Sequence, residues 1–105
     1  MNINNYIEKV KQDPANIIDI PEIDRTLYIC KEALRQDPMS LSYVPEYIIT
    51  YNMCLEAVNE NGAVLEFVPE KYKSYEICHI AVQDYPAALQ FVPGIFKNIG
   101  GNISV

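Results

Sequence analysis

The sequence lacks the residues on which most catalytic and metal sites are built. It contains no tryptophan, a single histidine (His79) and three cysteines, none of them in a Cys-x-x-Cys pair. No Gly-rich phosphate loop, metalloprotease helix or paired-carboxylate motif is present. A general base needs a positioned partner, and no serine or carboxylate pattern points to His79. We therefore predict a protein that is not an enzyme and that takes no cofactor and no metal.

Long hydrophobic runs and an excess of positive charge are also missing. No apolar run approaches the ~18 residues of a membrane span, and "MNINNYIEKV" has neither the cationic start nor the apolar core of a secretory signal. This predicts the cytoplasm of the producing cell, or of a host cell if the protein is exported. The net charge of −6 argues against nucleic acid or anionic lipid as a direct ligand, since both require Lys and Arg. It permits a protein partner, including a basic or nucleic-acid-binding one.

What the chain does contain is one pattern repeated every 24 residues. The segments "YICKEALRQDPMSLSYVP" (28–45), "NMCLEAVNENGAVLEFVP" (52–69) and "EICHIAVQDYPAALQFVP" (76–93) align without a gap. The columns they share extend into a fourth, N-terminal copy, and the clearest are Pro21, Pro45, Pro69 and Pro93, then Val10, Leu34, Val58 and Val82. We predict one domain, 1–98, made of repeats 3–26, 27–50, 51–74 and 75–98, followed by a tail, 99–105.

Each repeat has the pattern of two helices joined by a turn. Thr26, Thr50 and Ser74 stand where an N-cap is expected, and ten residues with one apolar face follow each of them. An Asp-Pro or Asn-Gly turn then leads to a shorter helix, which ends before the Val-Pro column because proline disfavours the α conformation of the preceding residue. Neither helix can bury its apolar face alone. The predicted fold is all-α, a short helical-repeat solenoid of about four 24-residue helix-turn-helix repeats.

The third and fourth repeats resemble a known family. Ala57-Val58, Asn61-Gly62 and Leu65-Glu66-Phe67 are similar to the tandem helical repeats of the domain of unknown function 4116 family. The first repeat departs from that pattern, with Lys9 in the alanine column and Asp19 in the aromatic one. The resemblance implies a helical fold and an effector-like setting, in proteins of intracellular bacteria and some viruses. It implies no activity.

The three cysteines share one column. Helices that stack lie ~8–10 Å apart, which exceeds the ~7 Å limit between the Cα atoms of a disulfide. We therefore expect Cys30, Cys54 and Cys78 to be small apolar residues of the core.

Glutamates recur in two further columns, and several tyrosines stand in variable columns. Two acidic stripes are predicted, with a spacing too wide for one calcium ion. They form either a solvated face, with charge near a helix N-terminus, or a surface complementary to a basic partner. Exposed tyrosine beside glutamate is typical of protein-binding surfaces. The residues concerned are Glu8, Glu32 and Glu56, then Glu22, Glu46 and Glu70, with Tyr28, Tyr47 and Tyr85.

The fourth repeat interrupts both acidic stripes. Ile80 and Gly94 replace the glutamates, and an apolar surface is predicted around His79, Ile80, Tyr85, Ile95 and Phe96. Either the tail covers this surface, or a partner or a second copy of the chain docks there.

Three functions fit these observations. The leading hypothesis is a non-enzymatic protein–protein interaction module that presents an acidic, tyrosine-bearing face. One alternative is an acidic inhibitor that mimics nucleic acid and blocks a nucleic-acid-binding protein. The other is a structural fragment of a longer repeat array.

Overall fold

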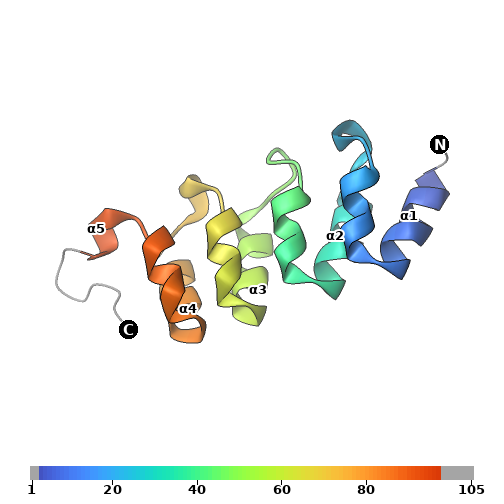
Figure 1. Ribbon diagram of the computed structural model, residues 1–105. Helices are drawn as coiled ribbons and strands as arrows, with labels where there is room; N and C mark the ends of the chain where they lie inside the picture. The colour runs from blue at the N-terminus through green and yellow to red at the C-terminus, as the bar shows by residue number, and fades with distance from the viewer. Residues whose placement is uncertain (1–2, 98–105) are drawn as a thin grey trace. The chain divides into compact units, whose positions relative to one another are not determined.

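The computed structural model describes residues 3–97, and within that range every regular element is helical (Figure 1). This confirms the all-α prediction. Four ten-residue α-helices begin 24 residues apart: α1 (Ile3–Gln12), α2 (Leu27–Gln36), α3 (Tyr51–Glu60) and α4 (Tyr75–Asp84). A short helix, α5 (Gly94–Lys97), follows. Over the described residues, no helix has the length and apolar character needed to cross a membrane.

The second helix of each repeat is a 3-10 helix. These helices are η1 (Pro14–Asp19), η3 (Pro38–Tyr43), η4 (Gly62–Phe67) and η6 (Pro86–Phe91). Each ends at a residue in extended conformation that precedes a proline, such as Val44 with φ −82° and ψ 128°, as expected before proline. The tight i to i+3 bonding of a 3-10 helix suits so short a segment.

Side-chain caps fix the starts of α2, α3 and α4, as predicted. The hydroxyls of Thr26, Thr50 and Ser74 accept hydrogen bonds from the amides of Ile29, Met53 and Ile77, at 3.4, 3.2 and 3.1 Å.

The 3-10 helices are capped in the same way in three repeats of four. Asp13, Asp37 and Asn61 each accept a hydrogen bond from the amide two residues later. The side chain of Tyr85, in the same column, makes no cap hydrogen bond at the start of η6.

The chain divides into two compact halves between Ile49 and Thr50. Each half contains two repeats. In the N-terminal half α2 packs against α1 and η1, and in the C-terminal half α4 packs against α3 and η4. That all four repeats form a single solenoid stays a prediction, and the tail 99–105 lies outside the described residues.

The core of each half contains residues of the predicted columns and, in addition, Ile29 and Ile77, whose column was not predicted. Val10, Ile17, Ile29 and Leu41 are buried in the N-terminal half, and Val58, Leu65, Ile77 and Val82 in the C-terminal half. Cys30, Cys54 and Cys78 are fully buried with free thiols, which confirms their predicted place in the core. Burial raises the pKa of each thiol to about 11, so the thiols stay protonated and unreactive at neutral pH.

Candidate functional site

A short turn follows each of the prolines Pro21, Pro45 and Pro69 and presents residues to solvent. The turns are η2 (Glu22–Asp24), residues 46–48 and η5 (Glu70–Tyr72). Each is closed by a hydrogen bond from its third residue to the proline carbonyl, at 2.8 to 2.9 Å. The first residue of each is an exposed glutamate: Glu22, Glu46 and Glu70.

The second residue of each turn is exposed to solvent. Ile23 is 80% exposed and Tyr47 69% exposed, and the equivalent Lys71 is also exposed. Ile23 was not among the predicted site residues. Its own column could have identified it, since a position that holds Ile23, Tyr47, Lys71 and Ile95 accepts a charge and therefore faces water.

Arg25 ties the first two turns together within the N-terminal half. Its Nε donates to the carbonyl of Ile20 at 2.9 Å and its Nη2 to that of Ile18 at 3.4 Å. Its Nη1 donates to the carbonyl of Tyr43 at 2.9 Å, three residues before Glu46. The planar guanidinium suits several acceptors at fixed angles, and the last carbonyls of a helix need such donors. Arg25 therefore holds the first turn next to the chain that enters the second turn.

Lys73 occupies the same column in the C-terminal half and acts differently. Its Nζ lies 2.7 Å from Glu70 Oε1, with the lysine side chain only 7% exposed and the glutamate side chain 77% exposed. Glu70 is therefore partly neutralised by its own turn. None of the described residues forms an ion pair with Glu22 or Glu46, so the negative charge of the turns is strongest in the N-terminal half.

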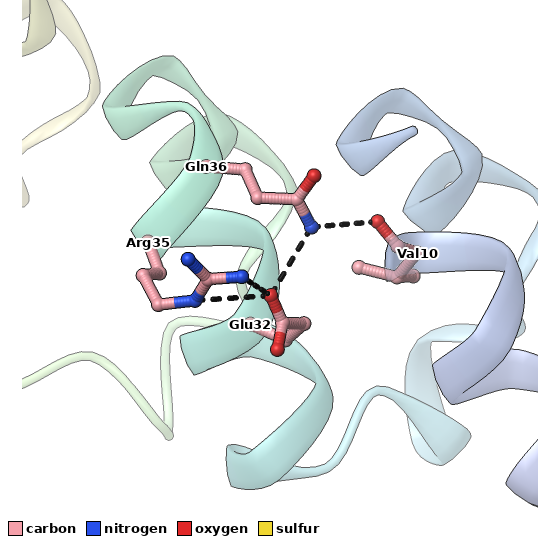
Figure 2. A network of polar contacts seen from close by, with 4 residues as sticks. All are labelled: Val10, Glu32, Arg35 and Gln36. Carbon is pink, nitrogen blue, oxygen red and sulfur yellow. Dashed lines mark hydrogen bonds and ion pairs between the residues drawn. The ribbon is translucent and has the colours of Figure 1, made fainter. Parts of the chain in front are cut away.

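The other predicted acidic column, Glu8, Glu32 and Glu56, is not uniformly exposed. Glu8 and Glu56 face solvent, but the side chain of Glu32 is only 12% exposed. Figure 2 shows the reason: Arg35 Nε and Nη2 and Gln36 Nε2 all donate to Glu32 Oε2. The hydrogen bond from Arg35 is the main cause that lowers the pKa of Glu32. The expected exposed stripe is therefore interrupted at Glu32.

The same network joins two helices. Gln36 Nε2 also donates to the carbonyl of Val10 at 2.9 Å (Figure 2), one of the last carbonyls of α1. Tyr28, 61% exposed, lies on the outer surface of α2. Together with Lys31, Glu32 and Arg35 it lines a shallow depression of about 240 Å³, whose charges are mixed rather than acidic.

In the fourth repeat, the predicted apolar residues are only partly brought together. The ring of His79 stacks on Tyr75 with centroids 5.8 Å apart, and Phe96 meets Tyr75 edge-on at 5.7 Å. Tyr85, 42% exposed, and Ile95, 66% exposed, lie outside these ring contacts. Ile80 is half-buried.

The described residues contain no group of three or more His, Cys, Asp or Glu side chains arranged to hold a metal ion. Comparisons of the chain with protein-family models, curated proteins and solved structures find no match. The resemblance to the domain of unknown function 4116 family accordingly stays a prediction.

Proposed function

We propose that the chain is a non-enzymatic module that binds another protein through the two turns of its N-terminal half. One observation carries this proposal: Ile23 and Tyr47 are 80% and 69% exposed at the same position of successive turns, directly after Glu22 and Glu46. Loops held by a rigid scaffold are where binding residues concentrate. We call Glu22, Ile23, Glu46 and Tyr47 the turn surface.

The energetics favour a partner with apolar pockets bordered by basic side chains. Complete burial of an exposed isoleucine or aromatic side chain contributes about 1.5–3 kcal/mol, so Ile23 and Tyr47 together supply the central anchors. The glutamates would form the rim and attract basic groups, which affects encounter rate and specificity more than affinity. Because Arg25 already holds the first turn next to the end of η3, which leads into the second turn, less ordering free energy is lost when the partner binds.

Capture of proteins from an extract of the native host by the immobilised chain tests the proposal. We expect Ile23→Ser and Tyr47→Ser each to remove the captured partner. Ile18→Ser is the matched control, because Ile18 is 56% exposed on η1 and the next repeat has a serine, Ser42, in that column. Equal capture by all four proteins, or turnover of a small molecule by the wild type, would contradict the proposal.

Salt separates this function from the alternative of nucleic-acid mimicry. A partner held by Ile23 and Tyr47 should stay bound as salt rises from low to moderate concentration, because apolar contacts are not screened. A mimic of nucleic acid depends on charge and should lose affinity steeply over the same range. A chain that captures nothing under either condition would favour a structural fragment of a longer repeat array.

We further propose that the four repeats form one solenoid and that the module works in the cytoplasm of the producing cell. An effector-like role would place it in the cytoplasm of a host cell instead. Detection of the tagged protein after cell fractionation distinguishes the two locations.

A further inference from the structure

The second repeat departs from the repeated pattern by two cations on α2. Lys31 and Arg35 stand four residues apart, so their side chains are neighbours on the helix surface. Neither column contains Lys or Arg in the C-terminal half, where the equivalent residues are Leu55, Asn59, His79 and Gln83. Two like charges at this spacing slightly destabilise a helix, so the formation of α2 does not explain the pair.

Both cations keep donor groups that no described residue uses. Arg35 donates to Glu32 through Nε and Nη2, while its Nη1 points away from that carboxylate (Figure 2). The side chain of Arg35 is 70% exposed, and Lys31 is exposed as well. Within residues 3–97, Lys31 takes part in no ion pair. Two positively charged groups of α2 are therefore open to a ligand.

Glu32 neutralises these cations only in part. Its side chain is 12% exposed, and its Oε2 accepts hydrogen bonds from Arg35 and Gln36. The hydrogen bond from Arg35 and, to a smaller extent, the positive charge of Lys11 lower the pKa of Glu32, so a third cation lies near the network. Three cations outweigh the one carboxylate, and the contact with Glu32 also holds the Arg35 guanidinium in a fixed orientation.

Lys31 and Arg35 line the shallow depression on α2, together with Tyr28 and Glu32. We call it the α2 depression. Tyr28, Glu32 and Arg35 follow one side of the helix, and the equivalent residues of α3 all face solvent: Asn52, Glu56 and Asn59. The volume of the α2 depression, about 240 Å³, is smaller than the roughly 300–1,000 Å³ of pockets that enclose small-molecule ligands. It has the size for one or two side chains of a protein.

Charge and the aromatic side chain select the class of ligand. The unpaired cations favour an anion, and Tyr28, 61% exposed, offers its ring to an apolar group beside that anion. Nucleic acid requires more cations than these, and Glu22 and Glu46 of the same half would repel a long polyanion. A short acidic segment of a protein carries few charges and supplies apolar side chains as well.

We infer that the α2 depression binds an acidic segment of a protein, with a carboxylate held between Lys31 Nζ and Arg35 Nη1 and a neighbouring apolar side chain on Tyr28. Charge-assisted hydrogen bonds from both cations would hold the carboxylate. Because Glu32 already orients Arg35, little side-chain freedom is lost on binding. The turn surface offers glutamates, the opposite charge, so this inference does not rest on the proposed function.

Fluorescence anisotropy tests the inference on the full chain, with a short labelled peptide of glutamate, leucine and glycine as the probe. The wild type should bind this peptide, and the affinity should fall as the salt concentration rises. Lys31→Glu should weaken binding about tenfold or more. Lys31→Gln, which only removes the charge, should act in the same direction but less strongly, and Tyr28→Ser should weaken binding severalfold.

Lys9→Glu is the matched control, because Lys9 is an exposed lysine of α1 in the column whose members Ala33 and Ala81 face the preceding repeat. It makes the same charge reversal away from α2 and should stay within about twofold of the wild type. Ile23→Ser should leave peptide binding unchanged, which separates the α2 depression from the turn surface. Circular dichroism of each variant checks that its helices are intact.

Four results would overturn the inference. The first is a wild type that does not bind the peptide, and the second is equal binding of a peptide with glutamine in place of glutamate. The third is an equal loss of affinity in Lys9→Glu and Lys31→Glu. The fourth is a single-stranded oligonucleotide that binds more tightly than the acidic peptide and loses affinity in the same variants.

Discussion

Gly62→Ala should destabilise the C-terminal half although glycine-to-alanine changes in helices are usually favourable. Gly62 is the first residue of η4 and is buried against α4. A Cβ atom at this position would lie 2.3 Å from the carbonyl oxygen of Ala81 and 3.1 Å from its carbonyl carbon. Both are backbone atoms of α4, so no side-chain rotation can relieve the overlap, and η4 must move away from α4.

Three contributions set the size of the effect. Overpacking of this kind costs about 1–3 kcal/mol. The displacement also weakens the hydrogen bond from the Gly62 amide to Asp84, a bond to a charged group worth about 1.5–3 kcal/mol when complete. The lower entropy of the unfolded chain with alanine offsets about 0.4–1 kcal/mol. We expect a net loss of about 2 kcal/mol, which lowers the melting temperature of a domain of this size by roughly 10 °C.

Urea and thermal unfolding followed by circular dichroism measure this loss, with Gly94→Ala as the control. A Cβ atom at Gly94 would meet nothing within 4 Å, so this variant should lie within about 0.5 kcal/mol of the wild type. If Gly62→Ala is as stable as Gly94→Ala, the close approach of η4 to α4 is wrong.

Four further predictions use the same unfolding measurements. Val58→Asp puts an unpaired charge in the core and should lower the free energy of unfolding by several kcal/mol, about ten times the effect of Glu56→Lys at an exposed position. Equal stabilities of the two variants would mean that the faces of α3 are misassigned. Tyr85→Asp should restore the missing cap of η6 and add about 1 kcal/mol, and a loss instead would show that the tyrosine itself holds η6. Arg25→Met should lower stability by about 1.5–3 kcal/mol, and Arg25→Lys should recover little because an ammonium cannot reach three carbonyls in one plane. Burial raises the pKa of the Cys54 thiol from 9.0 to about 11. The unfolded chain therefore loses this proton first, and the free energy of unfolding should fall as the pH rises through that interval. Cys54→Ala should lessen this fall, and an unchanged pH dependence in the variant would contradict the prediction.

The period of the sequence was sufficient to locate the α-helices and most of the core. A column that holds Val10, Leu34, Val58 and Val82 specifies a buried side of a helix, and Thr26 or Ser74 specifies where a helix begins. These features depend on residues close together in the chain, so pattern and capping chemistry determine them. The 3-10 form of the second helix was not predicted, because it depends on how six residues fit between a cap and the residue before proline.

The candidate site was predicted less completely, because exposure depends on neighbours that the period does not specify. Glu32 shares a column with Glu8, yet Arg35 and Gln36 on its own helix turn it inward. Ile23 looks like a core residue until its column is compared with Lys71. For Glu32 the deciding contact comes from Arg35, a residue that differs between repeats, so the repeated pattern does not specify it. The exposure of Ile23, in contrast, could have been predicted from its column.

The columns nevertheless explain how neighbouring repeats adjust to each other. Gln36 and Asp84 occupy the same column, and each makes a hydrogen bond to the preceding repeat, but with opposite polarity. Gln36 donates to the carbonyl of Val10, in a repeat whose turn has Pro14 and therefore no amide to offer. Asp84 accepts from the amide of Gly62, which exists because the third repeat has glycine where the others have proline. Within each half, the donor or acceptor in the second of its two repeats thus matches the proline or glycine in the first, so the two repeats of a half are fitted to each other and are not interchangeable copies.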